Sequence, residues 1–194
     1  MRRSDHGAMD SDRAHERTLT LEAFADTIVP GEKRFPGDVA VAGASEGGGA
    51  VAAGALPLLQ WDATGLTGAL DDYVRDLNAH TRQFAAEHRL TLDPALPPFA
   101  ALSFERRTEL VTLLTSPGHP EQELWVLLAL FCYMSYDAAP HLHTAEAIAG
   151  GHPGLTSMGI TPPDPDGLWR HPKNSYGRPL ARPHPDTTPS GSLR

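Results

Sequence analysis

The chain has 194 residues, of which 40% are hydrophobic and 21% are charged, with 18 glycines, 18 prolines and one cysteine. This length fits one domain with tails, because a domain typically holds roughly 100–200 residues. The single thiol, Cys132, excludes a scaffold of internal disulfides and a zinc knuckle of cysteines. The net charge of −8 argues against nucleic acid and membrane surfaces as partners, because both select a basic patch.

Residues 1–17 are expected to form a disordered lead. The first three residues, Met-Arg-Arg, are similar to the start of a twin-arginine export signal, but residues 4–17 are polar. An export signal needs an apolar segment of roughly 7–15 residues after its basic start. The longest apolar run, residues 124–134, is also shorter than the ~20 residues of a membrane-spanning helix. We therefore expect a soluble protein in the cytoplasm rather than one exported with a partner.

The spacing of apolar residues predicts a first helix over residues 20–29, with Thr20 as its cap and Glu22 and Asp26 on the solvent side. A Gly/Ala-rich segment follows from Ala44, and its small residues allow close packing. Residues 66–88 form the clearest amphipathic pattern, with one apolar face and one charged face.

Three further helices are predicted. Ser103 is a good cap for a helix over residues 104–115. Residues 121–137 start with acids and are then apolar on all sides, which is typical of the central buried helix of a bundle. Residues 144–149 form one short helix that ends at Gly150 and Gly151.

Residues 161–194 differ from the rest in composition. Eight of the 18 prolines lie there, a density that excludes the interior of a helix or sheet. Residues 165–194 carry a net charge of +3, whereas residues 1–164 carry −11. Large apolar side chains make full exposure costly, so we expect an arm that is partly ordered to about residue 182 and disordered beyond it. The predicted fold is all-α: a small irregular helical bundle over residues 18–160 with a long proline-rich C-terminal arm.

Asp137, His141, His143 and His152 are the candidate metal ligands, because imidazoles and carboxylates bind transition metals. His171 is an alternative member of this set. The alternative interpretation of His141 and His143 is that they hydrogen-bond backbone groups where the central helix ends.

The arm also carries the composition of a contact surface, in which aromatic side chains mix with cations and amides. The candidate partner-contact or pocket residues are Trp169, Arg170, His171, Asn174, Tyr176 and Arg178. The alternative is an arm that wraps its own bundle.

No catalytic nucleophile is evident in the sequence. Cys132 lies in the middle of the apolar helix, where a thiol is normally inert. Adjacent acids such as Asp71 and Asp72 point in different directions along a helix and do not form an acid/base pair.

Several features together resemble the gluconate 2-dehydrogenase subunit 3 family, in an actinobacterial-like offshoot. Residues 21–30 spell Leu-x-Ala-x-Ala-Asp-x-Ile-x-Pro, a Gly/Ala-rich stretch follows to about Ala55, and residues 151–154 (Gly-His-Pro-Gly) lead to the Trp/Tyr arm. The resemblance implies a small helical subunit of a hetero-oligomer. Its partner is a larger flavoprotein of the glucose-methanol-choline type, which holds the FAD and oxidises an alcohol or sugar-like substrate.

This resemblance implies no catalytic residue and no cofactor on this chain alone. The leading hypothesis is therefore an accessory subunit of an FAD-dependent oxidoreductase, which stabilises or completes the active site of the flavoprotein. Two alternatives remain: a stand-alone metal-assisted enzyme that uses the histidine cluster, and a small-molecule-binding helical module with a pocket between the central helix and the arm.

Overall fold

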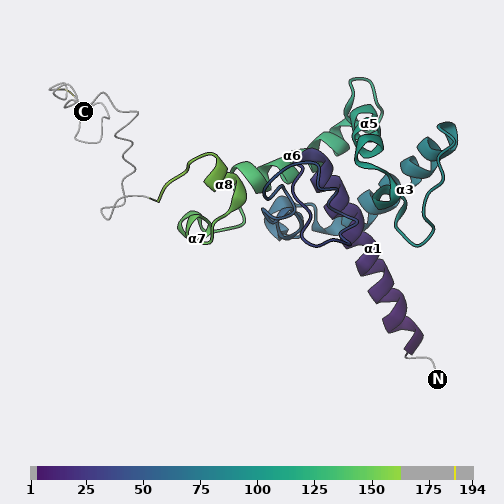
Figure 1. Cartoon of the computed structure of the whole chain (residues 1–194), viewed down its shortest axis with the longest axis horizontal. Coiled ribbons are helices and arrows are strands. Elements are labelled where there is room, and N and C mark those ends of the chain that lie inside the picture. Colours follow the sequence, from purple (N-terminus) through teal and green to yellow (C-terminus); the bar gives the residue numbers. More distant parts are fainter. Residues whose placement is uncertain (1–3, 163–185, 187–194) are drawn as a thin grey trace. The chain divides into compact units, whose positions relative to one another are not determined.

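The computed structural model describes residues 4–162 and residue 186, and it confirms the all-α class. Residues 4–162 contain helices and no strand (Figure 1). The chain divides into two units, Met1–Ile160 and Thr161–Arg194, and the fold described below belongs to the first. None of the helices in residues 4–162 is both long and apolar enough to cross a membrane.

The helices differ widely in length. In chain order they are α1 (Ser4–Ile28), α2 (Ala55–Leu59), α3 (Leu70–Glu87), α4 (Pro98–Ala101), α5 (Phe104–Thr115), α6 (Gln122–Asp137), α7 (Thr144–Ala149) and α8 (Pro153–Ser157). Two short 3₁₀ turns, Asp62–Thr64 and Thr67–Ala69, lead into α3. The predicted helices over 66–88, 104–115, 121–137 and 144–149 are confirmed with small shifts at their ends, and Ser103 caps α5 by accepting a hydrogen bond from the Arg106 N–H.

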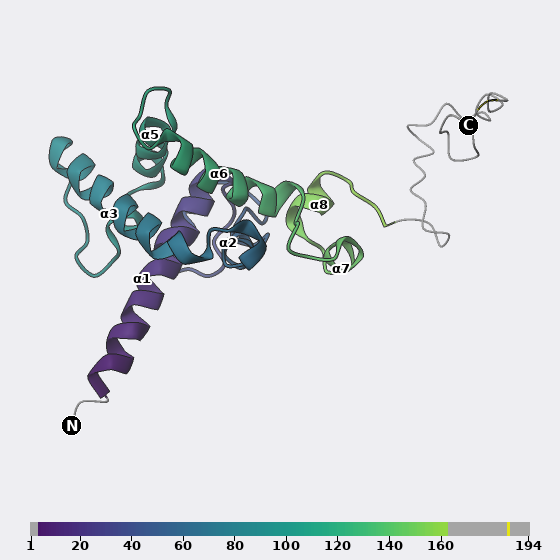
Figure 2. The same ribbon diagram turned by 180° about the vertical axis from the view of Figure 1, so that it is seen from behind.

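The first helix begins much earlier than expected. Residues 1–17 were predicted to be a disordered lead, but α1 is helical from Ser4, and its N-terminal turns extend beyond the other helices (Figure 1, Figure 2). Contacts with α3 explain the added turns nearest the bundle: Asn78 Nδ2 donates to Glu16 Oε1 at 3.0 Å, and Arg17 pairs with Asp71 at 3.1 Å. Thr20 is consequently a fully buried residue inside α1 rather than its cap.

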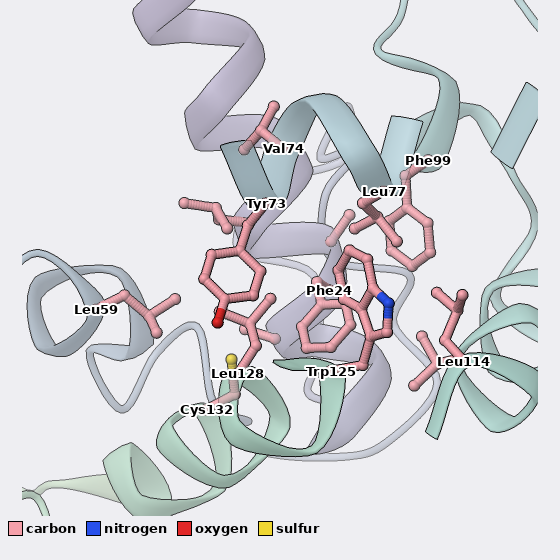
Figure 3. Packing of buried hydrophobic residues seen from close by; sticks show 14 of the residues in the cluster. Phe24, Leu59, Tyr73, Val74, Leu77, Phe99, Leu114, Trp125, Leu128 and Cys132 are labelled. Atoms are coloured by element: carbon pink, nitrogen blue, oxygen red, sulfur yellow. The ribbon is translucent and has the colours of Figure 1, made fainter. Parts of the chain in front are cut away.

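Aromatic side chains form the centre of the hydrophobic core. Figure 3 shows Phe24 of α1 beside Trp125 of α6, with Tyr73 of α3 and Phe99 of α4 around them. The ring centroids lie 6.4 Å apart for Phe24 and Trp125 and 5.9 Å apart for Tyr73 and Trp125. These distances are typical of tilted and edge-to-face aromatic pairs, which stabilise a core beyond simple burial.

Asp26 organises the long loop between α1 and α2, and it is buried rather than on the solvent side as predicted. Its carboxylate accepts hydrogen bonds from the Gly31 N–H at 3.2 Å and the Ala42 N–H at 2.8 Å. The loop also returns to its own start, because a Cβ on Gly31 would lie 2.3 Å from the backbone nitrogen of Gly49. The Asp-x-x-x-Pro-Gly end of the first-helix motif thus closes this loop.

Arg107 joins the same loop to the helices on its other side. Its guanidinium donates to the carbonyls of Val39 and Ala40, at 2.8 and 2.7 Å, and to those of Ala100 and Leu102, at 2.6 and 3.0 Å. A buried cation is stable only where its donors are satisfied. The side chain of Arg107 is 3% exposed, and its four carbonyl partners meet this requirement.

Candidate functional site

The four predicted metal ligands lie near one another in sequence but do not form a ligand set. Asp137 is the last residue of α6, while His143 and His152 are the N-cap residues of α7 and α8, and His141 lies in the turn before α7. In the part of the chain that the structure describes, no group of three or more His, Cys, Asp or Glu side chains could hold a metal ion. Ala139, with a φ of 45°, begins the turn that follows α6.

His152 has a structural role. Its Nε2 lies 3.1 Å from the carbonyl oxygen of Ala53, and its Nδ1 accepts a hydrogen bond from the Leu155 N–H at 3.3 Å. These contacts need a neutral ring that donates through Nε2. Since both ring nitrogens are engaged, His152 connects the start of α8 to the turn before α2 and has no lone pair left for a metal ion.

His141 lines an open pocket of about 450 Å³ beside His152. The pocket is bounded mainly by small and apolar residues of the turn before α2, of α2 itself, and of the α7–α8 region. They include Ala52, Gly54, Pro57, Leu142, Ala147 and Pro153, and one acid, Glu146. The walls are therefore largely methyl and methylene groups, with the imidazoles of His141 and His152 and one carboxylate.

The imidazole of His141 has no hydrogen-bond partner on its buried Nδ1. Its Nε2 lies against Gly54, 2.7 Å from the point that a Cβ on Gly54 would occupy. Burial, together with the neighbouring His152, lowers the pKa of His141 below its ordinary value. The ring is therefore neutral at pH 7, and it is a hydrogen-bonding group that no described residue anchors.

The second distinctive surface lies on α6, where the sequence predicted burial on all sides. One face is in the core, with Trp125, Leu128 and Cys132 each at most 1% exposed. The opposite face carries five large apolar side chains that are 38–51% exposed. We call this surface the outer face of α6: Leu124, Val126, Leu127, Leu130 and Tyr133. The expectation of a fully buried helix was therefore wrong.

Leu127 and Leu130 of the outer face belong to a stripe along α6 that has the spacing of a helix-packing seam. Glu123, Leu127, Leu130, Met134 and Asp137 follow one another at intervals of four, three, four and three residues. This is the a/d repeat by which one helix packs along another. The seam is apolar in the middle and has an acid at each end: Glu123 is exposed, whereas Asp137 is half-buried, with its Oδ1 enclosed and without a hydrogen-bond partner among the described residues.

A third cluster, which the sequence analysis missed, lies at the start of α6. Glu121 Oε2 lies 2.7 Å from His80 Nε2 of α3 and accepts a hydrogen bond from Trp125 Nε1 at 3.0 Å. The bond with His80 lowers the pKa of Glu121. His80 lies 41 positions from Glu121, and no local spacing signals the pair. The cluster fixes the first turn of α6 against α3.

The other predicted residues separate into two groups. Burial raises the pKa of the Cys132 thiol to about 12, which confirms an unreactive side chain. The six arm residues predicted for partner contact, Trp169, Arg170, His171, Asn174, Tyr176 and Arg178, lie outside the described residues.

The fold and these surfaces define an irregular all-α bundle with an exposed apolar helix face. Within that class, the chain belongs to a family of unknown function, DUF5987, whose profile matches residues 15–194. The match covers both the helical unit and the proline-rich segment. No curated protein and no solved structure matches the chain.

Proposed function

We propose that this chain is a non-catalytic accessory subunit of a larger FAD-dependent oxidoreductase and that it binds the flavoprotein through the outer face of α6. The observation that carries the proposal is this face itself, with five large apolar side chains 38–51% exposed on one helix. Contiguous exposed apolar surface is typical of protein interfaces. The resemblance to the gluconate 2-dehydrogenase subunit 3 family supports a flavoprotein of the glucose-methanol-choline type as the partner.

The charges at the ends of the seam favour a different protein over a second copy of this chain. In a pair of copies packed along α6, an antiparallel arrangement places Glu123 opposite Asp137, and a parallel one places each acid opposite itself. Like charges that face each other across a helix interface are destabilising. A partner helix with an apolar stripe and Lys or Arg at its ends complements this surface.

Two of the candidate reactive side chains, His152 and Cys132, have structural positions, which supports a role without catalysis. Both nitrogens of His152 are bound to backbone groups, and Cys132 is a buried thiol with a pKa of about 12. In this proposal the FAD and the oxidation of an alcohol or sugar-like substrate belong to the partner. This chain supplies a surface that stabilises the flavoprotein or completes its active site.

Co-purification tests the proposal. The tagged full-length chain is co-expressed with a flavoprotein of the glucose-methanol-choline type, and the eluted complex is analysed by size-exclusion chromatography. We expect the wild-type chain to retain the flavoprotein and the double variant Leu127→Asp, Leu130→Asp to release it. Phe35→Asp is the matched control, because Phe35 is an exposed apolar side chain, at 55%, on the loop after α1. It is expected to retain the flavoprotein.

Two results would contradict the proposal. One is separate elution of the two wild-type proteins with flavoprotein activity unchanged when this chain is omitted. The other is a homodimer that the Leu127→Asp, Leu130→Asp variant abolishes, since the outer face would then bind a second copy.

A further inference from the structure

The pocket beside His141 is separate from the outer face of α6, and the proposed function makes no use of it. Its volume of about 450 Å³ lies within the range of roughly 300–1,000 Å³ that is typical of small-molecule sites. Its walls are largely apolar, with few polar groups, which is also the usual composition of such sites.

The two histidines of this pocket differ in a way that points to a ligand. His152 uses both ring nitrogens to hold α8 against the turn before α2. His141 differs: among the described residues its Nδ1 is buried without a hydrogen-bond partner, whereas its Nε2 is not one of the buried unpaired atoms and makes no hydrogen bond. Nε2 is therefore the ring nitrogen that a ligand in the pocket can reach, and one unoccupied polar group among apolar walls is typical of a small-molecule site.

Gly54 shows that the ring is closely fitted at this position. A Cβ there would lie 2.7 Å from His141 Nε2 and 3.3 Å from Cε1, so only a residue without a side chain leaves space for the ring. Gly54 also has a φ of 88°, a conformation that glycine adopts without strain. The ring edge that carries Nε2 therefore lies beside a residue that itself lines the pocket.

We infer that this pocket binds a small uncharged molecule with a compact apolar body and a hydroxyl group that hydrogen-bonds His141 Nε2. The apolar body matches the walls formed by Ala52, Pro57 and Leu142. A hydroxyl both donates and accepts, so it pairs with either tautomer of a neutral imidazole. An anion is disfavoured because the pocket contains the carboxylate of Glu146 and no Lys or Arg side chain.

Imidazole NMR on the full-length chain tests this inference. The probes are cyclohexanol and cyclohexanecarboxylate, which share one ring and differ in the head group. Long-range ¹H–¹⁵N spectra resolve Nδ1 and Nε2 of each histidine during the titration. We expect cyclohexanol to give a saturable shift of the His141 Nε2 signal, and cyclohexanecarboxylate to give none.

Three variants separate the pocket from general effects on the fold. His141→Phe keeps an aromatic ring and removes the hydrogen bond, so it should weaken cyclohexanol binding about fivefold, as the loss of a net hydrogen bond of about 1 kcal/mol requires. Ala52→Leu adds bulk from an exposed pocket residue and should abolish binding. His143→Phe changes an exposed histidine outside the pocket lining and should leave binding unchanged.

The inference is overturned by a non-saturable response to cyclohexanol, by equal binding of the carboxylate, or by wild-type affinity in His141→Phe. Failure of this test leaves flavoprotein co-purification unaffected, because the pocket and the outer face of α6 share no residue. The two proposals are therefore tested independently of each other.

Discussion

Asp38 is the residue whose protonation most clearly links stability to pH. Its carboxylate accepts hydrogen bonds from Arg34 Nε at 2.7 Å and from the Val41 N–H at 3.1 Å. Burial alone raises the pKa of Asp38, but these bonds outweigh burial and lower it to about 2. Because the folded pKa lies below the unfolded one of about 3.9, the carboxylate stabilises the fold above pH 4, and this contribution is lost as the pH falls toward 2.

We predict that Asp38→Asn lowers the free energy of unfolding by about 1–3 kcal/mol at pH 7, because an amide cannot accept all the hydrogen bonds of the carboxylate. The difference from wild type should shrink as the pH falls from 4 to 2. Urea unfolding at pH 7 and at pH 2.5 measures both values. An equal deficit at the two pH values would contradict the ionic role of Asp38.

Gly54 leaves no space for a side chain beside the ring of His141. Gly54→Ala places a Cβ 2.7 Å from His141 Nε2 and forces a side chain on a residue with φ of 88°, so it should destabilise the fold by about 1–3 kcal/mol. A double-mutant cycle with His141→Ala separates the two causes. Removing the imidazole should recover the part of the loss that comes from the clash. Strict additivity would show that His141 does not press on Gly54.

Local patterns predicted residues with a local role and missed those with distant partners. Ser103 was identified as a cap because its partner, Arg106, is three residues away. Asp26 was placed on the solvent side because its partner Ala42 is 16 residues away, in a loop without periodicity. His152 was interpreted as a metal ligand from its neighbours in the sequence, because its actual partner, the carbonyl of Ala53, lies 99 residues away.

At the scale of helices, periodicity predicted α3, α5 and α6 well. It failed for α1, because residues 4–17 are polar and lack an apolar period. The end of this segment is held instead by contacts of Glu16 and Arg17 with α3. It also failed for the environment of α6. Apolar residues on every side of a helix indicate removal from water, but they do not distinguish the core of the same chain from the surface of a partner.

α6 therefore offers a matched pair of substitutions on neighbouring residues. Leu128→Ala empties a fully buried position and should cost about 2–5 kcal/mol of unfolding free energy. Leu127→Ala removes a side chain that is 38% exposed on the outer face and should cost clearly less, within about 1 kcal/mol. Thermal unfolding of the two variants measures the contrast. Equal losses would mean that the outer face is packed within the folded chain.

For the molecule as a whole, the all-α class followed from the absence of any alternating apolar pattern in the sequence. The surfaces that bear on function did not follow, because both depend on how distant helices meet. The pocket beside His141 is lined by residues of the turn before α2 and of the α7–α8 region, which are far apart in the sequence. The outer face of α6 consists of the apolar side chains of this helix that no other helix covers. Whether the outer face of α6 binds another protein therefore decides the function of this chain.

Isothermal titration calorimetry of the full-length chain with the purified flavoprotein tests that claim most directly. We predict a 1:1 complex with a negative heat-capacity change, the mark of buried apolar surface. Leu130→Asp should weaken the affinity by about 30-fold or more, as the loss of a hot-spot residue worth about 2 kcal/mol requires, while Phe35→Asp should leave it unchanged. No measurable binding by the wild-type chain, or equal affinity in the two variants, would contradict the account.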